Sequence, residues 1–144
     1  MARSVDSTKN MRNGHSDRLL DYSEQLGESF GLGEEDLHEL RIASWLHDIG
    51  KINVPEPILL KPGPLNAEER RIMREHPITG ENICKPLKSL RPILPVIRHH
   101  HERMDGSGYP DGLRGKDIPL KARILQVADI YDALTTDRPY RSAL

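Results

Sequence analysis

The sequence predicts an all-α protein, and three observations predict it. Apolar residues recur at three- and four-residue spacing in four or five segments, the period of a helix with one buried face. No segment alternates convincingly between apolar and polar residues, as a half-buried strand would. Stretches rich in proline and glycine separate the periodic segments, as links between short helices do. With 144 residues we expect a single compact multi-helix bundle, with a glycine-rich loop before its last helix.

The first two helices are predicted over residues 14–31 and 34–49. The stripe of the first helix consists of His15, Leu19, Tyr22 and Leu26, and that of the second of Leu37, Leu40, Ala43 or Ser44, and His47. Gly33 precedes the second helix and Gly50 follows it, and a glycine after the last turn is a common helix stop. Each of the two stripes carries a histidine.

The middle of the chain begins with a link over residues 54–64, whose prolines and glycine predict no regular helix. Asn66 is a plausible cap for a third helix, and Glu69 lies three residues on, where a capping box places it. His76 shares one face of that helix with apolar residues, and Pro77 is expected to kink or break it.

The last third of the chain predicts a short helix over residues 92–102, because proline is tolerated in a first turn. A glycine-rich loop follows over residues 104–119, and a final helix over residues 120–135. Asp129 lies in register with the apolar positions of that final helix, so it is expected to point inward.

Composition excludes several classes of protein. The formal net charge is −1 and aromatics are 4%, which argues against nucleic-acid polymers as partners. Cys84 is the single cysteine, which excludes an internal disulfide and fits a reducing compartment. The start lacks an apolar signal core, and no apolar run approaches the ~20 residues of a membrane span. We expect a cytoplasmic protein with no direct membrane insertion, a flexible tail over residues 1–10 and one domain over residues 11–144.

Histidines and carboxylates at inward positions predict a metal site. A single such histidine is more often a packed core residue, but several on separate helices, with two aspartates, favour a shared cation. The candidates are His15, His47, Asp48, His76, His100, His101 and Asp129. Neighbours on a helix point about 100° apart, so His47 can bind terminally while Asp48 bridges two ions. Two ions with a shared hydroxide favour phosphoester hydrolysis.

The segment from His100 to Gly112 is a second indication of a functional site, after the histidines and carboxylates. Its glycines permit close backbone approach, and Tyr109 offers an aromatic face beside the metal ligands. Cations form a third signal, because Lys51, Arg138 and Arg141 follow the predicted ligands and suit phosphate. Taken alone, each is better explained as an ordinary loop or a solvated surface charge.

With these residues in view, the sequence strongly resembles the HD-GYP phosphodiesterases, a branch of the HD metallohydrolases, from His15 onward. The matching stretches are His47-Asp-Ile-Gly-Lys51, Lys61-Pro-Gly63, His76-Pro77, His100-His-Glu102, Asp105-Gly-Ser-Gly-Tyr-Pro110, Arg123-Ile-Leu-Gln-Val-Ala-Asp129, Tyr131-Asp-Ala-Leu134 and Arg138-Pro-Tyr-Arg141.

The resemblance implies an enzyme that cleaves cyclic di-GMP to linear pGpG, and in some members onward to GMP. It implies iron or manganese ions held by the seven candidate ligands, with Asp48 bridging. Lys51, Arg138 and Arg141 would hold phosphates, and Lys51 or Asp132 would assist the leaving oxygen. The glycine-rich loop would contact the dinucleotide through Gly108, Tyr109 and Pro110. A partner domain of the GGDEF type and a homodimer are further expectations.

Two departures from the family pattern matter. Members with a third metal carry a glutamate four residues before the first histidine; here that residue is Met11, a poor ligand for hard ions. We therefore expect a binuclear site and release of pGpG. Relatives also continue in helical sequence past the match to Leu144, so we expect either a trimmed C-terminus or a small native protein. A missing C-terminal segment would expose apolar surface and favour dimerisation or marginal stability.

Two alternatives stay open. One is a catalytically silent module that senses cyclic di-GMP or docks a partner domain through the Tyr109 loop. The other is an HD metallohydrolase for a different nucleotide, such as a linear phosphodiester or guanosine polyphosphate.

Overall fold

The computed structural model describes residues 14–137, which form seven α-helices and three short 3-10 helices, with no strand in that range. This confirms the all-α prediction. The α-helices are α2 (His15–Ser29), α3 (Glu34–Leu46), α4 (Glu56–Leu59), α5 (Ala67–Met73), α6 (His76–Cys84), α7 (Leu94–His99) and α8 (Leu120–Thr135). The 3-10 helices are η1 (Ile49–Asn53), η2 (Lys88–Ile93) and η3 (Gly115–Asp117).

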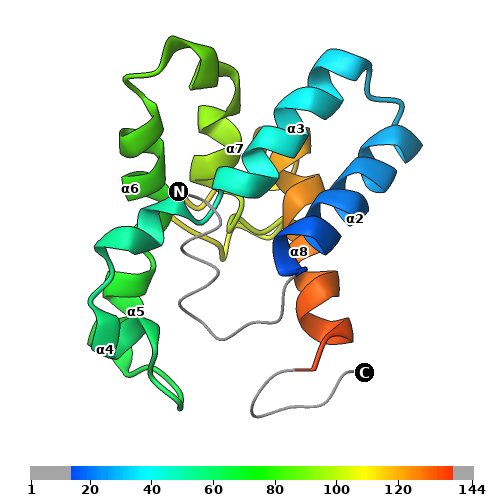
Figure 1. Ribbon diagram of the computed structural model, residues 1–144. Helices are drawn as coiled ribbons and strands as arrows, with labels where there is room; N and C mark the ends of the chain where they lie inside the picture. Colours follow the sequence, from blue (N-terminus) through cyan, green and yellow to red (C-terminus); the bar gives the residue numbers. More distant parts are fainter. Residues whose placement is uncertain (1–13, 138–144) are drawn as a thin grey trace.

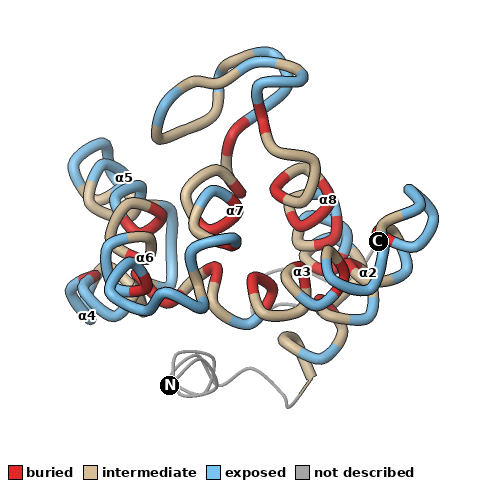
Figure 2. Tube along the Cα trace, turned by 90° about the horizontal axis from the view of Figure 1, so that it is seen from above, coloured by how far each residue is buried: buried red, intermediate tan, exposed pale blue. Residues whose placement is uncertain are grey.

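The helices form two groups that share one core. α2 packs against α3 and α8, while α6 packs against η1 and α7 (Figure 1). Figure 2 shows the buried positions of α3, α6, α7 and α8 turned toward the middle of the molecule, and the loop that precedes α8 reaching out from it. Leu40, Ile97 and Leu125 are among the side chains at most 1% exposed there. The first turn of α3 carries three acidic residues, which suits the positive end of its dipole.

The start of α5 confirms the predicted capping box. The Asn66 side chain accepts a hydrogen bond of 2.9 Å from the Glu69 amide, and the Glu69 carboxylate accepts one of 2.8 Å from the Asn66 amide. The predicted interruption at Pro77 is a full break, because α5 ends at Met73 and α6 begins at His76. His76 therefore lies at a junction between two helices.

Three local predictions were wrong. The link over residues 54–64 contains the single turn α4, because Pro55 caps it and Pro57 lies in its first turn, where no amide hydrogen is needed. The short helix predicted over residues 92–102 is η2 followed by α7, which ends at His99.

Gly50 is not the stop of α3 and lies instead inside η1. A Cβ there would lie 1.9 Å from the His76 carbonyl oxygen and 2.6 Å from the Gly80 amide nitrogen. Glycine is needed at this position because two backbones touch, not because the chain turns.

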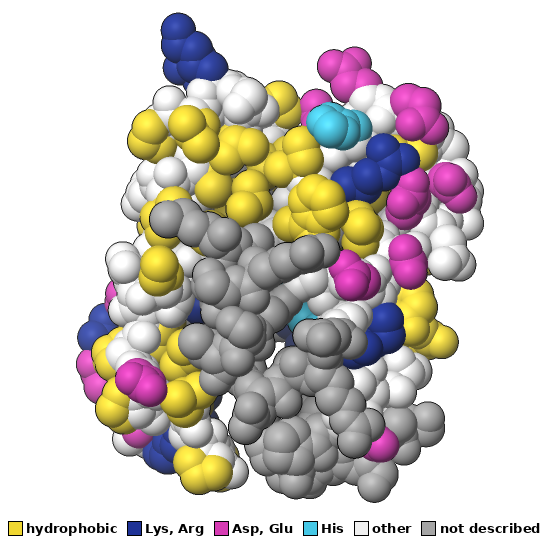
Figure 3. Space-filling view, in the orientation of Figure 1, with side chains coloured by type: hydrophobic (Ala, Val, Ile, Leu, Met, Phe, Trp, Pro, Cys, Tyr) yellow, Lys and Arg dark blue, Asp and Glu magenta, His cyan; other side chains and the backbone are white. Residues whose placement is uncertain are grey.

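Apolar side chains are also exposed on the surface. Figure 3 shows them gathered on the face that α3 and α6 present. Trp45 on α3 is 47% exposed and Leu87, just after α6, is 57% exposed. Within residues 14–137 no helix is long and apolar enough to cross a membrane.

Candidate metal centre

Three histidines of the candidate site lie just after the C-terminal ends of helices. His47 caps the C-terminus of α3, His100 caps that of α7, and His76 follows α5. In each case Nδ1 lies 2.7–2.8 Å from the carbonyl oxygen three residues earlier, in the last helical turn. A carbonyl only accepts, so each Nδ1 carries the proton and donates it, which leaves Nε2 with a lone pair. The carbonyls at a helix end have no intrahelical partner, and here they orient the imidazoles.

The Nε2 side of these rings meets a carboxylate. One ligand atom from each of Asp48, His76, His100 and His101 lies within 4.8 Å of the others. Oδ1 of Asp48 is 3.2 Å from Nε2 of His76 and 3.8 Å from Nε2 of His100. The two imidazole Nε2 atoms are 3.3 Å apart. Because both carry lone pairs, neither can donate to the other, and a cation between them would resolve the repulsion.

The second oxygen of Asp48 faces a different set of groups. Oδ2 lies 2.7 Å from Nζ of Lys51 and 3.5 Å from Nε2 of His47. Nε2 of His47 is buried and makes no hydrogen bond within residues 14–137. A buried imidazole nitrogen without a partner is costly unless something else binds it. Imidazole and carboxylate donors of this kind suit Fe, Mn or Zn, so the residues fit a divalent metal.

Electrostatics keep the cluster in its metal-binding form. Burial alone would raise the pKa of Asp48, but the charge of Lys51, with the imidazoles of His47, His100 and His76 close by, holds it well below the usual range. Burial lowers the pKa of His100 to about 4, against the attraction of Asp48. Burial and the neighbouring histidines lower the pKa of His101 as well. At neutral pH the carboxylate is therefore ionised and both imidazoles are neutral, as metal ligands must be.

A second pair lies between α2 and α8. Nε2 of His15 is 3.9 Å from Oδ1 of Asp129, while its Nδ1 donates to Oδ2 of Asp132 at 2.5 Å. Nε of Arg18 also donates to Asp132, at 2.6 Å. The side chain of Asp132 is only 2% exposed. Asp132 is thus the buried carboxylate that fixes the His15 ring and turns its Nε2 toward Asp129.

The loop after α7 is tied down by a buried carboxylate. Glu102 is 1% exposed and accepts hydrogen bonds from the Asp111 amide at 2.7 Å and the Leu113 amide at 3.0 Å. A Cβ on Gly108 would lie 2.5 Å from Cα of Glu102, so the loop packs directly on the chain beside the ligands. Glu102 therefore fixes the path of the loop that carries Tyr109.

The Tyr109 ring lies between His101, a candidate metal ligand, and the guanidinium of Arg74. Its ring stacks on that of His101 with centroids 4.9 Å apart and planes 16° apart. The guanidinium carbon of Arg74 lies 5.0 Å from the centroid of the same ring. Burial raises the pKa of Tyr109 to about 12, so its hydroxyl stays protonated at neutral pH. The single aromatic face expected from the sequence is therefore already in contact with His101.

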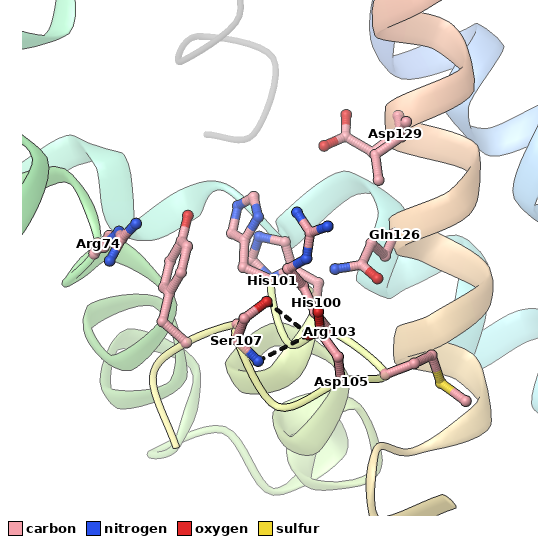
Figure 4. A pocket seen from close by; sticks show the side chains of 12 residues that line it. Arg74, His100, His101, Arg103, Asp105, Ser107, Gln126 and Asp129 are labelled. Carbon is pink, nitrogen blue, oxygen red and sulfur yellow. Dashed lines mark hydrogen bonds between the residues drawn. The ribbon is translucent and has the colours of Figure 1, made fainter. Parts of the chain in front are cut away.

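These groups line a cavity of about 560 Å³ (Figure 4). His100, His101 and Asp129 face it from α7, the following loop and α8, and Arg74 stands at its other side, away from α8. The remaining lining comes from Arg103, Met104, Asp105, Ser107, Gly108, Tyr109, Gln126 and Ile130.

The structure thus arranges the expected residues in two groups and leaves others apart. Asp48, His76, His100 and His101 converge, with His47 and Lys51 beside Asp48, while His15 and Asp129 form a separate pair. Gly108 and Tyr109 line the cavity, whereas Pro110 is not part of its lining. Arg138, Arg141 and Met11 lie outside the described residues.

Sequence reasoning missed Arg74, Arg18 and Glu102. Arg74 sits in a run of charged residues that looks like a solvated helix face, and only the fold brings it to Tyr109. Glu102 had a local signal, since it directly follows the histidine run and precedes the glycine-rich loop.

A helical bundle in which helix ends bring imidazoles and a carboxylate to one point, with a further histidine–aspartate pair between α2 and α8, is typical of a metal-binding domain. The chain belongs to the HD domain family, whose profile matches residues 1–144. The HD-GYP resemblance noted from the sequence is confirmed by this match and by the relatives. The family binds divalent metal ions, and the His/Asp cluster of this chain offers side chains that could hold them.

Several curated proteins are similar to the chain. It is 39% identical over 145 residues to the cyclic di-GMP phosphodiesterase response regulator RpfG of Xanthomonas campestris, which covers 99% of the chain and 38% of that protein. It is 43% identical over 132 residues to a cyclic di-GMP phosphodiesterase of Thermotoga maritima, covering 89% and 35%. It is 39% identical over 140 residues to the 3'3'-cGAMP-specific phosphodiesterase 3 of Vibrio cholerae, covering 97% and 30%.

The chain therefore spans about a third of the length of these relatives. Among solved structures, Bd1817, an HDGYP protein from Bdellovibrio bacteriovorus, superposes with a TM-score of 0.71 over 93% of the chain and 46% of that protein. The sequence identity is 24%, so this likeness supports the fold alone.

Proposed function

We propose that the chain is a metal-dependent phosphodiesterase that hydrolyses a cyclic dinucleotide, cyclic di-GMP first among them. One observation carries the proposal: Asp48 turns one oxygen to His76 and His100 and the other to His47 and Lys51. A carboxylate with a separate set of groups at each oxygen supports a role as a bridge between two ions. Two divalent ions, Fe or Mn, would supply Lewis acidity and a nucleophile at neutral pH.

The protein's own residues would position and protonate the substrate. His76, His100 and His101 would hold one ion with Asp48, and His47, His15 and Asp129 the other. Lys51 keeps its ammonium 2.7 Å from Asp48, beside the ligands, so it would donate a proton to the leaving oxygen. Asp132 is less suited to that role because its oxygens are engaged by His15 and Arg18. We assign Asp132 the orientation of His15.

The substrate class rests on the relatives, which are named for cyclic di-GMP and 3'3'-cGAMP. A binuclear site would release pGpG, as expected from Met11, and Gly108, Tyr109, Pro110, Arg138 and Arg141 remain candidate substrate contacts. We also propose a cytoplasmic location, in keeping with the free thiol of Cys84, and a GGDEF-type partner domain. The exposed apolar residues such as Trp45 and Leu87 support a homodimer.

The test is anaerobic hydrolysis of cyclic di-GMP by protein loaded with Fe(II) or Mn(II). We expect turnover to pGpG that both His47→Ala and Asp48→Ala abolish. His38→Ala is the matched control, because His38 is exposed on α3 and should leave turnover unchanged. Accumulation of GMP would contradict the binuclear assignment. Tight binding of the dinucleotide without turnover by loaded protein would make the chain a receptor instead.

A further inference from the structure

The cavity beside the proposed metal ligands contains an arginine, Arg74, that no carboxylate among residues 14–137 neutralises. Arg74 lines the cavity, and within residues 14–137 its guanidinium makes no ion pair and no side-chain hydrogen bond. Arg71, one turn earlier, pairs with Glu68 at 2.6 Å and Glu75 at 2.9 Å. The contrast between Arg71 in α5 and Arg74 directly after it indicates that the Arg74 charge is available for an external anion.

Arg74 is also held at a fixed place relative to the ligands. Its guanidinium carbon lies 5.0 Å from the Tyr109 ring centroid, and that ring stacks on His101 at 4.9 Å. Added together, these two distances place the Arg74 guanidinium carbon within about 10 Å of the centroid of the His101 ring, a proposed metal ligand. A cation over an aromatic face is stabilised there, so its position is defined before any ligand binds. Figure 4 shows Arg74 and Asp129 on opposite sides of the cavity, with His101 between them.

The other arginine of the cavity is less suitable. Hydrogen bonds from Ser107 lower the pKa of Asp105, and Arg103 lies close enough to that carboxylate to contribute, so the charge of Arg103 is partly balanced. Lys51 is bound to Asp48 at 2.7 Å. Among the described residues that line the cavity, Arg74 therefore offers the least compensated positive charge.

We infer that Arg74 binds the second phosphate of the cyclic dinucleotide, the one that is not being cleaved. This inference rests on the proposed function and adds a specificity-determining residue to it. A cyclic dinucleotide carries two phosphodiester anions, and only one can lie at the metal cluster. A guanidinium matches phosphate oxygens with two parallel hydrogen bonds. Arg74 thereby distinguishes substrates with two phosphates from simple diesters with one.

The experiment compares Arg74→Gln, Arg74→Lys and the matched control Arg71→Gln, all loaded with the same metal. The substrates are cyclic di-GMP, 3'3'-cGAMP and bis(4-nitrophenyl) phosphate, which has a single phosphate. For Arg74→Gln we expect KM for both cyclic dinucleotides to rise about tenfold with kcat nearly unchanged, as loss of a charged hydrogen bond predicts. Arg74→Lys should lie between Arg74→Gln and the unmodified protein. Turnover of the single-phosphate diester should not change in any variant.

Three results would overturn the inference. Equal behaviour of Arg74→Gln and Arg71→Gln would show that Arg74 binds nothing. Loss of single-phosphate turnover by the same factor would show that Arg74 only supports Tyr109 and the cluster. A KM effect confined to one of the two cyclic dinucleotides would show that Arg74 reads a base.

Equilibrium binding of cyclic di-GMP separates this inference from the proposed function. If the loaded protein binds cyclic di-GMP without cleaving it, the proposed activity fails, while tenfold weaker binding by Arg74→Gln still supports the phosphate site. If the loaded protein neither binds nor cleaves cyclic dinucleotides, both proposals fail.

Discussion

Replacing Gly50 by alanine tests whether the close contact between η1 and α6 positions the metal ligands. The new Cβ would lie 1.9 Å from the His76 carbonyl oxygen, whereas real contacts of this kind stay above 3.0 Å. The difference means that the carbonyl must retreat by about 1.1 Å, and since it belongs to the backbone of α6, the first turn moves with it. His76, now 3.2 Å from Asp48, would leave the cluster.

The expected cost of Gly50→Ala is about 1–3 kcal/mol of unfolding free energy, the usual range for an overpacked core. A displacement near 1 Å at a reacting centre costs roughly 100-fold in rate. Urea unfolding in the presence of a chelator measures the first quantity, and turnover by metal-loaded protein the second. Gly63→Ala is the control, because a Cβ there meets nothing within 4 Å. If Gly50→Ala matches Gly63→Ala in stability and turnover, the reasoning from backbone contact is refuted.

Three further changes probe the surroundings of the site. Asp132→Asn should weaken metal binding about 10- to 100-fold, since it loosens His15; full metal content with lost kcat would instead make Asp132 a proton donor. Glu102→Gln should cost about 1–3 kcal/mol, because one amide oxygen cannot serve both backbone donors, and should speed tryptic cleavage at Arg103. The exposed Glu68→Gln is its control, and equal cleavage rates would count against the anchor. Cys84 is 3% exposed and burial raises its pKa, so iodoacetamide should label it roughly 100-fold more slowly in native than in unfolded protein; rapid labelling would mean that α6 does not pack as described.

The sequence predicted the helices well where local chemistry decides them. Asn66 and Glu69 satisfy each other across one turn, so their capping box could be predicted without tertiary information. Gly50 shows the opposite case. As a residue after a helix it looks like a stop, but its real constraint is the backbone of α6, which is far along the chain.

The residues of the candidate site also fall into those that the local sequence predicts and those whose roles depend on the tertiary fold. The histidines and Asp48 were predictable because the sequence pattern puts each of them at or beside the inward face of a predicted helix. That His47, His76 and His100 follow helix ends and donate to the carbonyl three residues back could have been predicted from the helix bounds. Arg74 and Asp132 could not, because their roles depend on side chains of other elements, Tyr109 for the first and His15 for the second.

The central claim is that Asp48 joins two divalent ions, and anomalous X-ray diffraction tests it most directly. Crystals of protein loaded with Mn(II) or Fe(II) would be measured above and below the metal absorption edge. We expect two anomalous peaks in contact with Asp48, one beside His76, His100 and His101 and the other beside His47, His15 and Asp129. Absence of any peak at Asp48 in fully loaded protein would contradict the account, and a single peak would contradict its binuclear form.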